Sequence, residues 1–144
     1  MIDTAAKTPV HLWIVAILAV LWNAIGAFDY VATQYRLESY MSKFTPEQLD
    51  YFYNFPVWMD AAWAIAIWAA VLGSLALLMR KALAAWLFGI SILGLATSTV
   101  YNFILSDGMA IMGDNAVKIT AVIWIIGLFL YFYSSAMATR RVLR

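Results

Sequence analysis

The chain of 144 residues contains no cysteine and one histidine, and only 12% of its residues are charged. Without cysteine the protein has no disulfide framework, no thiol nucleophile and no thiolate metal site. No second histidine or carboxylate stands at metal-ligand spacing from His11, and neither a nucleophile motif nor a phosphate-binding glycine loop occurs. We therefore expect no metal, no cofactor, no catalytic residue and no enzymatic activity.

Apolar residues dominate the composition, at 65% of the chain. A water-soluble domain of this size would not tolerate that fraction with so few charges. Each of four apolar runs is long enough to cross a hydrocarbon core, which needs about 20 helical residues. The sequence predicts an all-α polytopic membrane protein, a single four-helix transmembrane bundle over residues 1–144. The predicted helices are residues 10–32, 57–79, 82–105 and 116–137.

The first apolar run also has features of a secretory signal peptide, with Lys7 before it and the small residues Ala24, Gly26 and Ala27 near its end. The run is longer than a usual signal core and continues past the candidate cleavage site, so we expect a retained helix.

Basic residues divide unequally between the two sides of the membrane that four crossings define. The side with the termini should be cytoplasmic by the positive-inside rule, and both termini with it. The balanced net charge of +1 makes nucleic acid an unexpected partner. The cytoplasmic set is Lys7, Arg80, Lys81, Arg140, Arg141 and Arg144, and the external set is Arg36, Lys43 and Lys118.

The first external loop carries the signature of its own short helix. Thr45, Pro46 and Gln48 fit the N-cap, the first helical position and the last member of a capping box, which predicts a helix over residues 46–53. Two interpretations stay open: a lid over an external opening, or an interfacial helix that only closes the bundle. Rings that favour the headgroup level surround it, namely Tyr40, Phe44, Tyr51, Phe55 and Trp58.

Small residues recur every four positions along the second apolar run, at Ala62, Ala66, Ala70 and Ser74. Such a stripe lets two membrane helices approach closely. We expect the partner to be another helix of the same chain rather than a second copy.

Polar and aromatic residues gather in the external half of the predicted bundle, whereas the cytoplasmic half is mostly aliphatic. Ionisable groups do not face lipid cheaply, so they should point at protein or water. Two interpretations stay open: a pocket open to the outside, or an inert hydrogen-bonded cap. We expect Lys118 to have a carboxylate partner or to reach the headgroups. The predicted ligand-binding set is Asn23, Asp29, Tyr30, Asp60, Trp63, Tyr101, Asn102 and Lys118.

The segment LWNAIGAFDYVATQ, followed by YMSKFTPEQLDYFYNFP and a tryptophan-rich second helix, resembles a family of small bacterial four-helix inner-membrane proteins. Some members carry the label sugar transporter. The resemblance covers nearly the whole chain and implies the bacterial inner membrane. A much weaker likeness is to the emopamil-binding and sigma-2 receptor group, where only Asp29 and Asp60 match. The absence of that group's histidine and glutamate pattern argues against sterol isomerase chemistry.

Two classes of function follow. The first is a membrane protein that binds, or helps to transport, a small polar or cationic molecule in the external half. The alternative is a non-catalytic structural or accessory subunit of a membrane complex. The partners that we expect are the lipid bilayer, a small-molecule ligand, and a second copy of the chain or another membrane protein.

Overall fold

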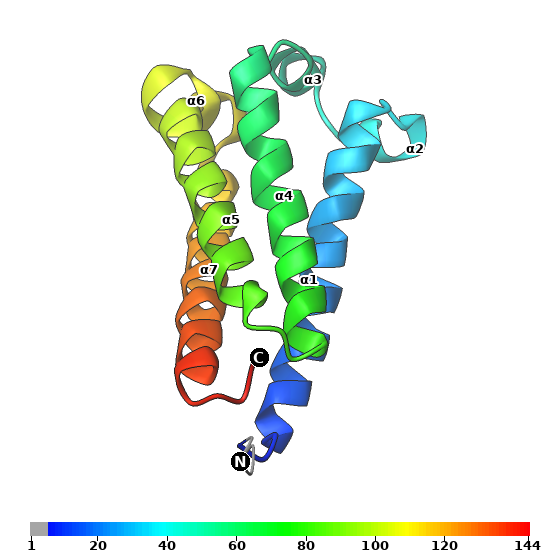
Figure 1. The fold of residues 1–144 in the computed structure, drawn as a ribbon. Coiled ribbons are helices and arrows are strands. Elements are labelled where there is room, and N and C mark those ends of the chain that lie inside the picture. The colour runs from blue at the N-terminus through cyan, green and yellow to red at the C-terminus, as the bar shows by residue number, and fades with distance from the viewer. Residues whose placement is uncertain (1–5) are drawn as a thin grey trace.

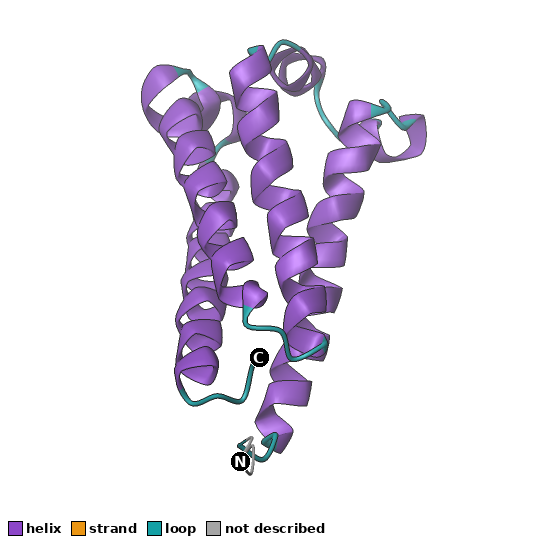
Figure 2. Ribbon diagram, viewed as in Figure 1, coloured by secondary structure: helices purple, strands orange, loops and turns teal. Residues whose placement is uncertain are grey.

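The computed structural model describes residues 6–144, and residues 1–5 of the predicted domain lie outside the described part. The described chain is all-α, without a strand, which confirms the predicted fold class (Figures 1 and 2). Four helical segments are long and apolar enough to cross a membrane. They are α1 (Val10–Gln34), α4 (Val57–Leu78), α5 (Leu83–Val100), which the π-helix η1 (Tyr101–Leu105) extends, and α7 (Asp114–Thr139).

Three short helices join the spanning segments at one end of the bundle, which we call the loop end. They are α2 (Glu38–Met41), α3 (Pro46–Tyr53) and α6 (Gly108–Met112). α3 has the predicted bounds, and both hydrogen bonds of the predicted capping box between Thr45 and Gln48 are present. The short helices α2 and α6 were not predicted from the sequence. The opposite end, which carries Val10 and Thr139, is the terminal end (Figure 1).

Each spanning helix packs against its neighbour in chain order, so that α4 and α5 lie between α1 and α7 (Figure 1). A side chain at Gly26 of α1 would come within 3.3 Å of Ile67 in α4. On the other side, Trp124 Nε1 of α7 donates to Thr99 Oγ1 of α5 at 3.0 Å.

The small-residue stripe of α4 finds its partners within the chain. A Cβ built on Gly94 of α5 would lie 2.7 Å from both Ala62 O and Ala66 N, so the two backbones touch there. Ser91 Oγ also donates to Ala66 O at 2.6 Å. Ser74, at the other end of the stripe, instead accepts a hydrogen bond from Asn23 of α1. The stripe therefore serves two helix interfaces, and its partner nearer the loop end is α5.

The buried apolar core lies toward the terminal end. At this end α1 contacts α7, and His11 Nδ1 lies 2.5 Å from the Tyr133 hydroxyl. The core joins all four spanning helices and the segment after α7, with the following buried members: Leu12, Ala16, Ala19, Ala76, Leu77, Ala84, Phe88, Leu130, Met137, Val142 and Leu143.

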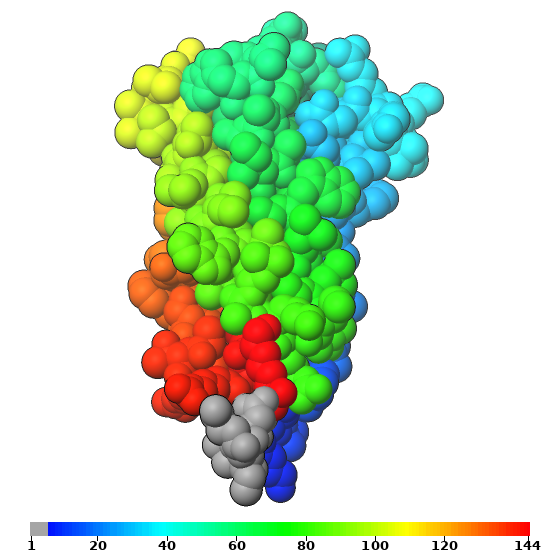
Figure 3. All heavy atoms as spheres, viewed as in Figure 1, coloured from blue at the N-terminus to red at the C-terminus, as the bar shows by residue number. Residues whose placement is uncertain are grey.

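The segment after α7 turns back beneath the bundle. Arg144 N donates to Arg80 O and Ala82 N donates to Arg144 O, both at 2.9 Å, so the tail pairs with the α4–α5 turn. Val142 and Leu143 are buried against the core. In Figure 3 the tail, in red, lies against the green surface of the turn.

Three spanning helices end in the same motif with an arginine at its left-handed position. Arg36, Arg80 and Arg141 have φ angles of 53°, 57° and 58°. In each case the arginine amide and the next amide bond back to carbonyls of the last helical turn, which is the Schellman arrangement. Glycine usually fills that position because a side chain there costs roughly 1 kcal/mol. The positive charge of each arginine offsets part of this cost, because a cation is stabilised near the negative end of the helix dipole.

Candidate functional site

The loop end is covered by a small layer made of α3, η1 and α6. The capping box fixes the start of α3, and Gln48 Nε2 donates to Ile111 O of α6 at 3.4 Å. This bond and the contacts described next hold α3 across the end of the α5 and α6 segments. The short loop helix predicted from the sequence is thus attached to a specific part of the bundle.

Tyr51 is the central attachment between α3 and η1. Its hydroxyl donates to Asn102 Oδ1 at 2.6 Å and lies 2.8 Å from Ser106 Oγ. Ser106 Oγ in turn donates to Tyr101 O at 2.8 Å. Burial raises the pKa of Tyr51 above its ordinary value, and the contact with Ser106 partly offsets this rise. The phenol therefore stays protonated at neutral pH and remains a hydrogen-bond donor.

The close approach at Tyr51 depends on the local backbone. A Cβ on Gly108 would lie 2.5 Å from both the Tyr51 hydroxyl and Asn102 O, so only glycine fits there. Tyr101 and Asn102 begin the π-helical segment η1, whose wider turn replaces the last α-helical turn of the span. Such turns recur at functional sites because they redirect side chains.

Aromatic rings connect this layer to the spanning helices in a continuous series of contacts. Tyr101 lies edge-on to Phe55, with ring centroids 5.6 Å apart, and to Trp58 at 5.4 Å. Phe55 contacts Trp63 at 6.1 Å, and Trp63 contacts Tyr30 at 4.9 Å. Such edge-on pairs each add stabilisation of about 0.5 to 1.5 kcal/mol beyond their buried area. The loop end is therefore held by rings and hydrogen bonds rather than by an aliphatic core.

The two predicted carboxylates at this end have separate partners. The Tyr40 hydroxyl of α2 donates a hydrogen bond to Asp29 Oδ1. Burial raises the pKa of Tyr40, and the hydrogen bond to Asp29 and its negative charge raise it further. Asp60 instead accepts a hydrogen bond from Gln34 Nε2 at 3.2 Å. Each carboxylate thus joins α1 to a different element.

Two members of the predicted set lie away from the others. Asn23 Nδ2 donates to Ser74 Oγ at 2.7 Å, and Ser74 is in the last turns of α4 toward the terminal end. Asn23 therefore makes a contact between α1 and α4, apart from the rings and carboxylates of the loop end. Lys118 is exposed and has no carboxylate within the 4.0 Å of an ion pair among residues 6–144, so only the headgroup alternative stays open for it.

A cavity of about 320 Å³ lies at the loop end, where residues of α3, η1 and α6 line it. Glu47 and Asp50 supply two carboxylates to its wall, and no basic residue lines it. Asn54 Nδ2 donates to Asp50 Oδ1 at 2.9 Å and orients that carboxylate. The complete lining is Glu47, Asp50, Tyr51, Asn54, Tyr101 and Ile111.

Of the eight predicted ligand-binding residues, Tyr101 alone belongs to this lining. Asn102 lies directly behind it, bonded to Tyr51, and Tyr30 and Trp63 belong to the ring series on the α1 and α4 side. The lining residues missed by the sequence analysis had a recognisable signal. Glu47, Asp50, Tyr51 and Asn54 recur at the three- and four-residue spacing of a single helix face.

The chain matches no protein-family model, no curated protein and no solved structure. Residues 6–144 contain no group of three or more histidines, aspartates and glutamates placed to hold a metal ion. The polar groups that line the cavity are two carboxylates, two phenol rings and an amide. That set suits a ligand with positive charge and hydrogen-bond donors.

Proposed function

We propose that this membrane protein binds a small cationic molecule in the cavity beside α3. The observation that carries the proposal is the pair of carboxylates, Glu47 and Asp50, in a concave site with the rings of Tyr51 and Tyr101. Carboxylates attract a cation, and the faces of aromatic rings add cation–π attraction of about 0.5 to 2 kcal/mol. The volume of about 320 Å³ falls at the lower end of the range for small-molecule pockets.

The proposed location is the bacterial inner membrane, with both termini in the cytoplasm and the cavity facing the outside. The positive-inside rule supports that orientation, because six of the nine basic residues lie at the terminal end. An amine or quaternary ammonium compound in the periplasm would then reach Glu47 and Asp50 without crossing the bilayer.

Binding, rather than transport by a single chain, is the activity that we propose. The cavity lies at the loop end, whereas the buried apolar core lies toward the terminal end. The packed helices separate a ligand at Asp50 from the terminal end of the bundle. A role in transport would therefore require a second copy or another membrane protein to complete a path.

Thermal unfolding of the purified protein with added ligands tests the proposal. Choline and small primary amines should raise the midpoint, because a ligand that binds only the folded state stabilises it by about 2.7 kcal/mol at one hundred times its Kd. Neutral sugars of similar size should give no shift. Asp50→Asn and Glu47→Gln should remove the rise with cations. Glu38→Gln, which changes an exposed carboxylate of α2 outside the cavity, should preserve it.

Three outcomes would contradict the proposed ligand class: no shift with any cation, a shift with sugars alone, or an unchanged shift in Asp50→Asn. A shift with sugars alone would favour the class suggested by the family resemblance. No shift with any ligand would favour the alternative of an accessory subunit.

One observation bears on that alternative. Only 6% of the most apolar 18-residue stretch of α7 is buried, against 33% of the corresponding stretch of α4. α7 therefore has a wide apolar face for lipid or another membrane protein.

A further inference from the structure

The side chains around the cavity beside α3, which we call the loop-end cavity, supply mainly hydrogen-bond acceptors. Glu47 and Asp50 each carry a carboxylate, and neither forms an ion pair within residues 6–144. Residues three positions apart on a helix are neighbours, with Cβ atoms about 5 to 6 Å apart. One positively charged group can therefore contact both carboxylates at once.

Asn54 adds a third acceptor to the lining. Its Nδ2 group donates to Asp50 O at 2.7 Å and to Asp50 Oδ1 at 2.9 Å. Both of these oxygens only accept, so the two amide hydrogens of Asn54 face Asp50 and its Oδ1 faces away from it. That amide oxygen has no hydrogen-bond partner within residues 6–144. An N–H group of a ligand can therefore bond to it.

Most side-chain donors of the lining are already used within the protein. The single hydrogen of the Tyr51 hydroxyl is donated to Asn102 Oδ1, and both hydrogens of Asn54 Nδ2 go to Asp50. In the described part of the chain, Tyr101 has the one lining hydroxyl without a hydrogen-bond partner. A ligand with several N–H donors therefore finds acceptors here, whereas a ligand that needs donors finds few.

The aromatic rings of the lining do not favour a fully methylated cation. A quaternary ammonium ion binds best where several ring faces surround its methyl groups. Here the rings of Tyr51 and Tyr101 have centroids 6.4 Å apart, and Phe55 contacts both, at 5.2 Å and 5.6 Å. Trp58 also lies against Tyr101. Neighbouring rings therefore cover part of both lining rings, and the two do not form an aromatic cage.

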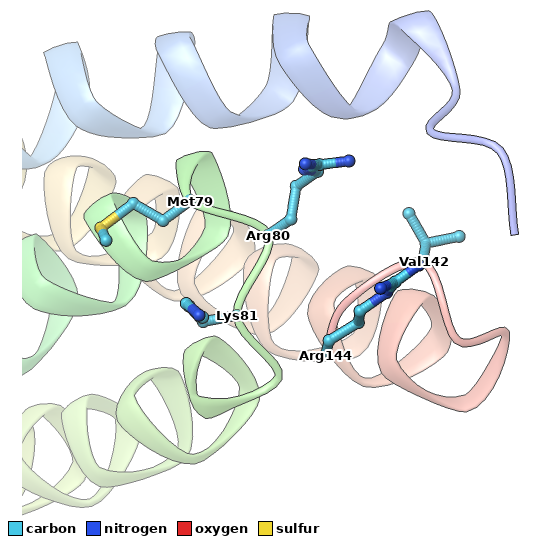
Figure 4. Close-up of a pocket in the computed structure, with 5 residues that line it drawn as sticks. All are labelled: Met79, Arg80, Lys81, Val142 and Arg144. Atoms are coloured by element: carbon cyan, nitrogen blue, oxygen red, sulfur yellow. The ribbon is translucent and has the colours of Figure 1, made fainter. Parts of the chain in front are cut away.

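A second cavity, at the terminal end, has the opposite character (Figure 4). It has a volume of about 200 Å³ and lies between the α4–α5 turn and the tail after α7. The carboxylate and amide acceptors that suit an ammonium ion belong to the loop-end cavity. Three of the five residues that line the second cavity are basic and supply N–H donors, and the full lining is Met79, Arg80, Lys81, Val142 and Arg144.

We propose that the ligand of the loop-end cavity is a primary ammonium ion and not a quaternary one, an inference that rests on the proposed function. A primary ammonium ion has three N–H donors and no acceptor, which matches Glu47, Asp50 and Asn54. A trimethylated nitrogen has the same charge and no donor. Asn54 is the positioning residue, because it holds one carboxylate oxygen of Asp50 and leaves the other for the ligand.

The test compares ethanolamine with choline, which differ only by three N-methyl groups and both carry one positive charge at neutral pH. Isothermal titration of the purified protein should give a Kd about tenfold lower for ethanolamine, the effect of one hydrogen bond to a charged group. Asn54→Leu keeps the net charge, so it should weaken ethanolamine binding severalfold and leave choline binding unchanged. Asn115→Leu, which changes an exposed asparagine of α7 outside the lining, should preserve both affinities.

The outcomes separate this inference from the proposed function. Equal affinities in the wild-type protein, or tighter binding of choline, would overturn the preference for a primary ammonium ion while the cation site stands. Binding of neither cation would contradict the proposed function itself. An unchanged preference in Asn54→Leu, or an equal loss of both cations, would overturn the positioning role of Asn54. The wild-type comparison needs no variant, so misfolding of Asn54→Leu would not obscure the ligand class.

Discussion

The hydroxyl of Tyr51 in α3 donates to the side-chain oxygen of Asn102 in η1 at 2.6 Å. This bond joins a loop helix to the end of a spanning helix, and the same tyrosine ring lines the cavity between them. The geometry of the proposed ligand site therefore depends on a contact that also positions α3.

Tyr51→Phe should loosen α3 while leaving the spanning helices intact. The change removes a hydroxyl from Asn102 and Ser106, which should lower stability by roughly 1 to 2 kcal/mol. Hydrogen exchange should show faster exchange of the α3 amides and little change in α4. Tyr53→Phe is the matched control, because the contact of the Tyr53 ring with Arg36 does not involve its hydroxyl. Equal exchange in both variants would mean that the Tyr51 bond does not hold α3.

Gly94→Ala should be the most damaging glycine substitution within the spanning helices. Its Cβ would lie 2.7 Å from backbone atoms of α4, which can yield only if the helices separate. Overpacking of this kind costs about 1 to 3 kcal/mol. Gly127→Ala is the control, since its nearest neighbour would be Leu95 Cδ2 at 3.9 Å. Denaturant unfolding in detergent should place Gly94→Ala well below Gly127→Ala, and similar stabilities would contradict the close α4–α5 contact.

The bond between Asn23 and Ser74 should appear as a coupling energy between α1 and α4. In a double-mutant cycle with Asn23→Leu and Ser74→Ala, we expect a coupling of about 0.6 kcal/mol, which is the average for hydrogen bonds between membrane helices. Pairing Asn23→Leu with Ser98→Ala is the control, because the Ser98 hydroxyl bonds to Gly94 O in its own helix. A coupling that is the same for both serines would rule out a specific contact.

The Tyr40–Asp29 pair should make stability sensitive to alkaline pH. The pKa of Tyr40 is raised in the folded state, so the folded state favours the protonated phenol. Its contribution is complete below the ordinary tyrosine pKa of about 10 and is lost as the pH rises above it toward the folded value. Unfolding midpoints between about pH 8 and about pH 11 should fall less steeply for Tyr40→Phe than for the wild-type protein. Parallel curves would contradict the pairing.

Reporter fusions test the proposed orientation. Fusions after Asp50 and after Gly108 should report an external location, because both lie at the end with fewer basic residues. Fusions at Lys81 and after Arg144 should report the cytoplasm. An external Lys81 would reverse the orientation and would place the proposed cation site in the cytoplasm.

The sequence predicted features that depend on local chemistry. The capping box at Thr45 and Gln48 defines α3 from neighbouring residues alone. The small stripe at Ala62 and Ala66 predicted close helix packing, because only side-chain size and helical spacing matter. Asn102 was predicted as a member of the polar cluster at this end, and the structure gives it Tyr51 as a hydrogen-bond partner.

Other features depend on contacts that spacing does not encode. The π-helical turn at Tyr101 changes which side chains point toward the cavity, and it has no sequence signature of its own. Asn23 seemed to belong with Asp29 because both lie on α1, but its bond to Ser74 follows from the register between α1 and α4. The return of the tail to Arg80 was equally invisible, since it joins backbone groups.

The pairing of Arg144 with the α4–α5 turn is a contact of high sequence separation. Such contacts form late, because closing a long loop costs entropy that nearby contacts do not. Both bonds require α5 and α7 to have crossed the membrane already. The pairing of the tail with the α4–α5 turn therefore marks a chain whose insertion is complete.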